Sequence, residues 1–372
     1  MRLTRLALQN FRCYALARIA LPPGPIAFVG ENGGGKTSLL EAAYALATGK
    51  SFRAAALGRL IRSGASEAAV LGEWLADEKQ KPRERELRIP LAGGGRGVQF
   101  FLHGKPVPRG AIPEFLPVVA FCREFLAILS GPPEGRRRFL DRGLIAADNR
   151  YLEFSAEVRR ALRQKQAALA VDDVRTLRAL QETLAPRVFR MQRARLRFVD
   201  KLSRALPLLA EELAVEGGEI PPLTLRYRPS PGAAAVEALA AGDLAAWKPH
   251  FAAALAGERK RQMILSGPQR DELEILWDNR PVAQASGGQQ RLALYLLKRA
   301  KVEVLARQFK TPPLFLLDDA DAEWDDLRLG AVLASLARAP GQLLLTAKRR
   351  EVVELLPVQP TVFTVKAGKV TG

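Results

Sequence analysis

The sequence has few cysteines, few aromatic residues and no long uninterrupted run of apolar residues. Its 372 residues include only Cys13 and Cys122, so neither a disulfide framework nor a cysteine-rich metal site is expected. No stretch reaches the roughly 18 consecutive apolar residues that indicate a membrane span. The first residues, MRLTRLALQNFRCY, lack the apolar core of a secretion signal. We therefore expect a cytoplasmic protein.

Acidic residues are also in short supply. The chain carries 39 Asp and Glu against 57 Lys and Arg, which gives a formal net charge of +18. Such an excess predicts an acidic partner, either nucleic acid or an anionic membrane surface, although a basic composition that only serves solubility would give the same count. Aromatic residues make up 7% of the chain and form no evident stacking platform for single strands, so duplex DNA is the favoured partner.

Periodicity predicts an α/β region, then a mostly helical region, then a second α/β region, with boundaries at 1–125, 126–261 and 262–372. Alternating residues at 2–11 and an apolar run at 26–30 indicate strands, and Gly49 ends the helix that begins at Lys36. The turn HGKP favours an antiparallel pair between the strands near 84–92 and 97–107. Other expected elements are a strand at 68–76, helices at 148–170, 173–206 and 287–308, helical sequence at 233–261, and strands in LRYRP, LEILW, LFLLDD, GQLLLTAK and TVFTVKAGKV.

Four glycines lie in one short segment, GENGGGKTS, which fits the P-loop pattern G-x-x-x-x-G-K-[ST]. Glycines let backbone N–H groups surround phosphate oxygens, and the helix that follows points the positive end of its dipole at the same anion. Lys36 is expected to reach the β- and γ-phosphates, and the Thr37 hydroxyl to bind Mg²⁺. The residues expected around the nucleotide are Gly30, Glu31, Asn32, Gly33, Gly34, Gly35, Lys36, Thr37 and Ser38.

Two further motifs lie near the end of the chain. The apolar run Leu314 to Leu317 ends in Asp318 and Asp319, as in a Walker B strand whose first carboxylate binds Mg²⁺ and whose second orients the attacking water. Some thirty residues earlier, Ser286, Gly287 and Gly288 precede an amphipathic helix. This segment resembles the signature of ABC-type ATPases, in which it closes on the γ-phosphate bound by another subunit, so Ser286 and Gly288 are expected to contact nucleotide across an ATP-dependent dimer.

The order of P-loop, long helical insertion, signature and Walker B looks like the ATPase heads of the SMC family. Within that superfamily the chain resembles the RecF family of bacterial recombination mediators along essentially its whole length, and the short insertion fits that family. The resemblance implies an ABC-type P-loop NTPase head, of α/β class, with a mostly helical inserted domain. The blocks that carry it are LALQNFRCY at 6–14, GENGGGKTSLLEAAYALATGKSFR at 30–53, GPPEGRRRFLDRGL at 131–144, LRYRP at 225–229 and SGPQRDEL at 266–273.

The resemblance also implies a function in recombinational repair. ATP and Mg²⁺ would join two heads into a homodimer that clamps duplex DNA near a single-strand junction, and hydrolysis would release it. The implied partners are RecR and RecO, and the implied outcome is the loading of RecA onto gapped DNA. Two alternatives remain at this point: the ATPase subunit of an ABC transporter, and a binding module that holds ATP with hydrolysis largely lost.

Several positions depart from the family pattern. Gln269 stands where the family usually has His, and Gly287 where a longer polar side chain is common. Where family members tend to read Glu-Leu-Asp after Walker B, this chain has Glu323 followed by Trp324 and Asp325. Thr346 and Lys348 lie where a γ-phosphate sensor is expected. These departures are expected to affect hydrolysis more than nucleotide binding, so a weak DNA-dependent ATPase is the predicted activity.

Basic side chains are dense in the helical region. Arg190, Arg193 and Arg197 fall within i+3 and i+4 reach of one another and are predicted to share a DNA-binding helix face. Contacts of this kind reach phosphates and supply affinity without base specificity. The alternative for each cluster is a solvated helix face. Further clusters are Arg136 to Arg138 with Arg142, then Arg159, Arg160, Arg163 and Lys165, and then Arg259 to Arg261.

Overall fold

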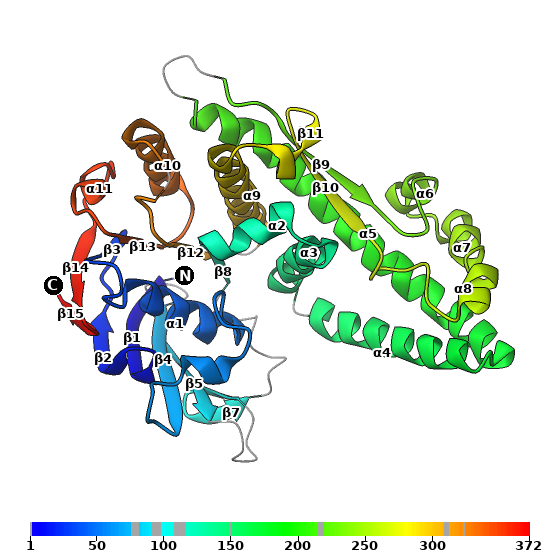
Figure 1. The fold of residues 1–372 in the computed structure, drawn as a ribbon, viewed down its shortest axis with the longest axis horizontal. Helices are drawn as coiled ribbons and strands as arrows, with labels where there is room; N and C mark the ends of the chain where they lie inside the picture. The colour runs from blue at the N-terminus through cyan, green and yellow to red at the C-terminus, as the bar shows by residue number, and fades with distance from the viewer. Residues whose placement is uncertain are drawn as a thin grey trace. The chain divides into compact units, whose positions relative to one another are not determined.

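The computed structural model describes residues 2–75, 82–90, 98–107, 117–148, 150–214, 219–308, 312–322 and 324–372. The chain forms two compact units (Figure 1). The first unit consists of Met1–Leu126, Leu208–Ile220 and Ser286–Gly372, and the second of Ala127–Pro207 and Pro221–Ala285. The segment 262–285, which the sequence assigned to the C-terminal lobe, thus lies in the second unit, because its strand pairs with the strand in LRYRP.

The first unit contains two six-stranded sheets. One has the strand order β2-β1-β4-β5-β6-β7 and is antiparallel throughout. The other has the order β15-β14-β3-β13-β12-β8 and is parallel except for β15. The strands are β1 Arg2–Phe11, β2 Tyr14–Ala20, β3 Ile26–Val29, β4 Glu67–Leu75, β5 Arg83–Pro90, β6 Gln99–Leu102, β7 Lys105–Val107, β8 Val118–Phe121, β12 Leu314–Leu317, β13 Leu343–Ala347, β14 Thr361–Lys366 and β15 Lys369–Thr371.

Helix α1, Lys36–Thr48, contacts strands of both sheets. It is buried around almost its whole circumference, because strands of both sheets pack against it. Gly49 ends it in the left-handed conformation, as the sequence predicted. The other helices of this unit are α9 Gly287–Gln308, α10 Asp326–Arg338 and α11 Glu351–Glu354, with short 3-10 turns η1 Leu57–Leu60 and η3 Arg123–Leu126.

The parallel sheet brings distant segments of the chain to one edge. Strands β3, β13 and β12 are fully buried apolar runs that lie side by side. Because they are parallel, their carboxyl ends meet, and this is the edge at which open α/β sheets bind ligands. The P-loop follows β3 and Asp318 follows β12, so the topology places the two motifs together.

The second unit is mainly helical with one small antiparallel sheet of order β11-β10-β9. The predicted helices near 148–170 and 173–206 are confirmed as α4 Arg150–Ala170 and α5 Val174–Glu212, of which the last five residues belong to the first unit. The other elements are α2 Ala127–Ser130, α3 Pro133–Ala147, α6 Ala235–Ala241, α7 Leu244–Ala252, α8 Leu255–Arg261, β9 Leu223–Arg228, β10 Glu272–Trp277, β11 Arg280–Pro281 and the 3-10 turn η4 Val282–Gln284.

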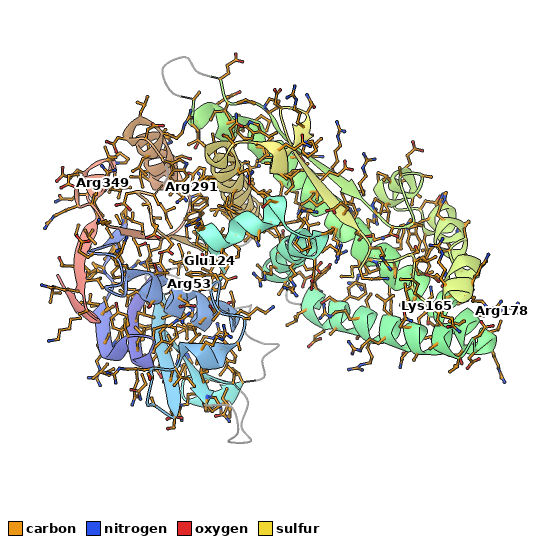
Figure 2. The ribbon with its side chains drawn as sticks, in the orientation of Figure 1. Arg53, Glu124, Lys165, Arg178, Arg291 and Arg349 are labelled. Atoms are coloured by element: carbon orange, nitrogen blue, oxygen red, sulfur yellow. The ribbon has the colours of Figure 1, made fainter. Side chains whose placement is uncertain are left out.

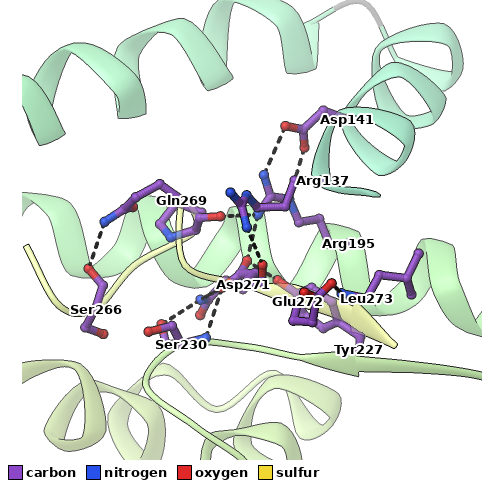
Figure 3. Close-up of polar contacts among 12 residues, drawn as sticks. Arg137, Asp141, Arg195, Tyr227, Ser230, Ser266, Gln269, Asp271, Glu272 and Leu273 are labelled. Atoms are coloured by element: carbon purple, nitrogen blue, oxygen red, sulfur yellow. Dashed lines mark hydrogen bonds and ion pairs between the residues drawn. The ribbon is translucent and has the colours of Figure 1, made fainter. Parts of the chain in front are cut away.

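Hydrogen bonds and ion pairs of buried charged side chains connect the elements of the second unit (Figure 3). Asp271 is fully buried and accepts hydrogen bonds from Gln192, Arg195, Tyr227 and the Ser230 N–H. Burial alone would lower the pKa of Arg195, but Asp141 and Asp271 together raise it well above its ordinary value. This cluster joins α3, α5, β9 and the start of β10, so the block SGPQRDEL has a structural role in this unit.

None of the helices among the described residues is long and apolar enough to cross a membrane.

Candidate nucleotide-binding site

The P-loop connects β3 to α1 and lies against the turn between β14 and β15. The Gly368 N–H donates to Gly34 O at 3.0 Å. At Gly30 a Cβ atom would lie 2.1 Å from Val365 O, so only glycine permits this close approach of backbone to backbone. Gly35 precedes α1 in the left-handed conformation, with φ of 114°. The first turn of α1 therefore begins without a side-chain cap and without an acidic residue, which leaves its N–H groups suited to an anion.

The segments around the P-loop are joined to α1 through Glu41, which is fully buried. Arg12, in the turn between β1 and β2, donates from Nε to Glu41 Oε2 at 2.8 Å, and the Ser51 hydroxyl donates to the same carboxylate. Tyr14 donates its hydroxyl to Gly35 O at 3.1 Å. These contacts explain physically why the family-like blocks NFRCY and KSFR belong with the P-loop, because they hold its helix and its last glycine in place.

Lys36 and Thr37 point into the site from the first turn of α1. Lys36 is 4% exposed, and its ammonium donates to Gly30 O at 2.6 Å and to Glu31 O at 3.0 Å. The Thr37 hydroxyl donates to Asp318 Oδ1 at 2.9 Å, which joins residues separated by 281 positions in the chain. The structure thus brings together the P-loop and the Walker B residue that the sequence singled out independently.

Asp318 is buried directly after β12 and accepts hydrogen bonds from two hydroxyl groups. Thr346 of β13 donates to Asp318 Oδ1 at 2.7 Å, the same oxygen that accepts from Thr37. Burial raises the pKa of Asp318 to about 6, and the neighbouring charge of Asp319 adds to the rise, whereas the hydrogen bonds from Thr346 and Thr37 oppose it. A carboxylate held this way, next to a threonine hydroxyl, offers the hard oxygen ligands that Mg²⁺ prefers.

Asp319 is exposed and its backbone is fixed from two sides. Its φ of 50° places it in the left-handed region, which aspartate tolerates better than most residues. The Asp319 N–H donates to Thr346 Oγ1 at 2.8 Å, and Arg291 donates to Asp319 O at 3.2 Å. The carboxylate is therefore presented from a rigid backbone at the edge of the site.

Arg291 is a residue of the site that sequence reasoning missed (Figure 2). It is buried on α9, five residues after Ser286, with its guanidinium 4.8 Å from the centre of the Trp324 ring and 5.3 Å from that of Phe121. The two rings stack on each other with centroids 5.4 Å apart. The available signal was an arginine directly before the apolar run LALYLL of a core helix, since a charge at such a place needs a dedicated partner.

Ser286 caps the N-terminus of α9 in an exposed position. Its hydroxyl accepts from the Gln289 N–H at 3.3 Å, and its own N–H donates to Gln289 Oε1 at 3.0 Å, a reciprocal capping box. A Cβ atom at Gly287 or Gly288 would meet nothing within 4 Å. Packing within the chain thus does not require glycine at either position.

The structure describes three of the remaining residues that depart from the family pattern, Gln269, Trp324 and Lys348. Gln269 donates to Ser266 O at 3.3 Å within its own turn of the second unit. Trp324 covers Arg291, as described above, whereas Glu323 lies outside the described residues. Lys348 follows β13, with its ammonium 3.7 Å from Glu31 Oε2 of the P-loop.

The basic side chains of the second unit fall into two groups. Arg190 and Arg197 are exposed on α5, and the Arg190 guanidinium lies 4.8 Å from the centre of the Phe154 ring of α4, but Arg193 is half-buried with its guanidinium against Gly242. Other members of the basic clusters are occupied inside the unit. These are Arg136, paired with Glu272 at 2.7 Å, Arg137, which donates to Asp271 O at 2.9 Å, Arg195 of the Asp271 cluster, and Lys165, which is 0% exposed and paired with Glu258 at 2.6 Å (Figure 2).

Comparison with known proteins gives consistent relatives. The family described as "RecF/RecN/SMC N terminal domain" matches residues 2–371. The DNA replication and repair protein RecF of Anaeromyxobacter sp. (strain Fw109-5) is 37% identical over 380 residues, which cover 100% of this chain and 99% of the relative. The protein of the same name from Thermomicrobium roseum is 33% identical over 377 residues, 94% of each chain.

Solved structures show the same fold. A structure of the recombination mediator protein RecF with ATPrS, in the RecFOR pathway, superposes with a TM-score of 0.83 at 22% identity, covering 99% of this chain and 97% of that one. An Smc head bound to the C-terminal winged helix domain of ScpA superposes with a TM-score of 0.56 at 18% identity, covering 100% of this chain and 97% of that one. The architecture of an ABC-type ATPase head with a helical insertion is therefore established for this chain.

Proposed function

Because this chain belongs to the RecF family, we propose that it is an ATP-dependent DNA-binding protein of DNA replication and recombinational repair. Membership of this family removes the transporter alternative. The relatives that this chain matches over 94% to 99% of their length are named DNA replication and repair proteins.

The hydrogen bond between Thr37 and Asp318 carries the proposal of nucleotide binding. It unites the P-loop with the Walker B strand at the edge of a parallel sheet, where a glycine cradle and an uncapped helix N-terminus already favour phosphate. ATP is proposed to bind there, with Lys36 on its outer phosphates. Thr37 and Asp318 would hold Mg²⁺, which neutralises charge on the phosphates.

The signature segment supports an ATP-dependent homodimer. Ser286, Gly287 and Gly288 form the exposed N-terminus of a 22-residue helix, and open space surrounds both glycines. Contacts within the chain do not require glycine at these two positions. The absence of side chains there instead leaves room for another molecule to approach the backbone closely. We propose that it is the nucleotide bound by a second copy, whose γ-phosphate the helix dipole would favour.

Replacing Ser286 by arginine is expected to abolish the ATP-dependent dimer while one head still binds ATP. The bulky cation would fill the exposed approach to α9, and it would also remove the hydroxyl that accepts from the Gln289 N–H. Molar mass from light scattering, measured with and without ATP and DNA, checks the result. Ser286→Thr keeps a capping hydroxyl and should dimerise like the wild type. If Ser286→Arg dimerises equally well, Ser286 is only a local cap.

The second unit is proposed to bind duplex DNA near a junction with single-stranded DNA. Arg190 and Arg197 are exposed on one long helix, in a chain with a formal net charge of +18. No base-reading motif is evident, so contacts to phosphates would supply the affinity. ATP-driven dimerisation would close two copies on the duplex, slow hydrolysis would release it, and RecR- and RecO-type mediators are the proposed partners.

The double charge reversal Arg190→Glu with Arg197→Glu is expected to weaken duplex binding for all base sequences alike. Each lost phosphate contact should reduce the slope of log affinity against log salt by about 0.9. Fluorescence anisotropy across a salt series measures both quantities. Arg175→Glu with Arg178→Glu, at exposed positions near the start of the same helix, makes the same change in net charge. An equal loss in this control would show that overall charge, rather than the proposed face, determines the affinity.

A further inference from the structure

We propose that the solvent-facing side of the antiparallel sheet in the first unit is a docking surface for an extended segment of a partner protein. The segment would carry an acidic, an apolar and a basic side chain at every second position. The inference does not depend on the proposed binding of nucleotide or DNA. Three observations carry it: a hollow in this face, the apolar side chains that line the hollow, and two charges of opposite sign on its two sides.

The hollow crosses four neighbouring strands, β2, β1, β4 and β5 (Figure 1). Its volume is about 330 Å³. Ala7 of β1 lies directly opposite Arg18 of β2 on one side and Leu71 of β4 on the other. Ala69 of β4 also lines the hollow. The two alanines carry only a methyl group, so they leave a space that longer side chains would fill on an ordinary solvated sheet.

The side chains that line this hollow are apolar where an antiparallel sheet is expected to be polar. Alternate residues of the same strands, among them Leu6 and Val70, belong to the core that includes α1. Alternation therefore assigns the hollow to the face that such sheets expose to solvent. Leu71 and Ala69 are nevertheless on this face, and Leu16 of β2 is 61% exposed. Apolar surface of this kind, with a charged rim, is typical of a site at which a partner binds.

Two charged side chains on opposite sides of the hollow have no ion-pair partner within the part of the chain that the structure describes. They are Arg18 of β2 and Glu84 of β5, three strands apart. Neighbouring charges are already paired with each other, Arg5 with Glu73 at 2.8 Å and Arg88 with Glu86 at 2.7 Å. The free charge is thus positive on the β2 side and negative on the β5 side. Nucleic acid fits this face poorly, because its phosphates would meet the carboxylate of Glu84.

The distance between these two strands matches an extended chain laid across the sheet. Three strand-to-strand spacings amount to about 14 Å, and residues i and i+4 of an extended chain lie about 13 to 14 Å apart with their side chains on one face. An acid at position i would reach Arg18, and a base at i+4 would reach Glu84. The apolar side chain at i+2 would fill the hollow. A second copy of this face is a worse fit, because two concave surfaces leave a void between them.

NMR of the full chain tests the proposal during titration with the peptide Gly-Ser-Asp-Ser-Leu-Ser-Lys-Ser-Gly. The methyl groups of the lining residues Ala7, Ala69, Leu16 and Leu71 are the reporters. We expect saturable shifts of these signals. A peptide with Ser in place of Leu should bind roughly ten-fold more weakly, because it leaves the hollow empty. A peptide with Lys in place of Asp should bind up to about five-fold more weakly, the usual range for an exposed ion pair.

Variants of the chain locate the binding site. Ala69→Ile fills the hollow with a residue that suits a strand, and should weaken binding of the Asp-Leu-Lys peptide roughly ten-fold. Ala20→Ile makes the same change at an exposed position of β2 that faces the same side but does not line the hollow, and should bind like the wild type. Arg18→Glu should reverse the preference, so that the peptide with two lysines binds more tightly than the one with Asp and Lys.

Three results would overturn the inference. The first is a lack of saturable shifts at the reporters with the Asp-Leu-Lys peptide at millimolar concentration, or equal affinity for all three peptides. The second is a shift of the same methyl signals by a duplex oligonucleotide, which would assign this face to nucleic acid. The third is a dimer that light scattering detects without ATP and that Ala69→Ile abolishes, which would assign the face to a second copy.

Discussion

Replacing Lys36 by alanine is expected to weaken ATP binding by at least roughly a hundred-fold, because the ammonium is the nearest positive charge to the phosphates inside the P-loop. In the structure Lys36 is almost fully buried and its ammonium donates to two P-loop carbonyls, so the charge already lies within the loop that would surround the nucleotide. Calorimetric titration with ATP and Mg²⁺ measures the loss.

Two companion variants separate charge from shape. Lys36→Arg keeps the charge but replaces a point charge with a planar fork, so it should retain part of the binding and hold the γ-phosphate poorly. Lys50→Ala removes an exposed lysine just after α1 and should bind ATP like the wild type. Undiminished affinity in Lys36→Ala would contradict the assignment of this loop to nucleotide binding.

The second large effect is expected from Asp319→Asn, which should slow ATP hydrolysis by about a hundred-fold or more and prolong the ATP-bound dimer accordingly. The exposed carboxylate of Asp319 is proposed to orient the attacking water next to the γ-phosphate. Asparagine tolerates the same left-handed backbone and keeps the bonds of the Asp319 N–H and carbonyl, so the fold should persist. Single-turnover hydrolysis and the dimer lifetime after dilution are the measurements.

Asp326→Asn provides the matched loss of charge in the same segment, at an exposed carboxylate paired with Arg349, and should hydrolyse ATP at the wild-type rate. An unchanged turnover in Asp319→Asn would remove Asp319 from the reaction. If the wild-type chain itself shows no turnover, the protein is the ATP-gated binding module that the sequence left open, and Asp319→Asn would leave the dimer lifetime unaltered.

Much of the fold was predictable because its signals are local. Alternation in β1, the apolar run of β3 and the glycine after α1 each follow from neighbouring residues, and all three predictions are confirmed. Strands β2 and β8 and helix α10 were not predicted. Strand β8 has only four residues, and a short apolar run of this kind does not distinguish a strand from part of a helix. The predicted domain boundary at residue 262 also differs from the boundary of the second unit, which continues to Ala285. The reason is that β10 pairs with β9, a strand that precedes helices α6 to α8 in the sequence.

The site was predictable wherever a motif is contiguous in sequence. The P-loop, Asp318 and Ser286 were found that way, and the structure brings Thr37 to Asp318. The sequence could not identify side chains whose roles depend on tertiary packing, because their basic clusters look alike whether they are buried or exposed. Arg195 and Lys165 belonged to clusters that look like solvated basic surface, yet each is buried against a carboxylate from a distant segment. The assignment of Arg190, Arg193 and Arg197 to DNA remains a prediction, with Arg193 the least accessible of the three.

The position of β3 in its sheet has a consequence for biosynthesis. Both of its neighbours, β13 and β14, come from the last thirty residues of a 372-residue chain. At synthesis rates of about 5–20 residues per second, the strand before the P-loop waits roughly 15 to 60 s on the ribosome before either partner exists. A nascent chain therefore leaves this apolar strand without its two neighbours for all of that time. Truncation before Leu343 would remove both neighbours of the P-loop strand while leaving every P-loop residue in the sequence.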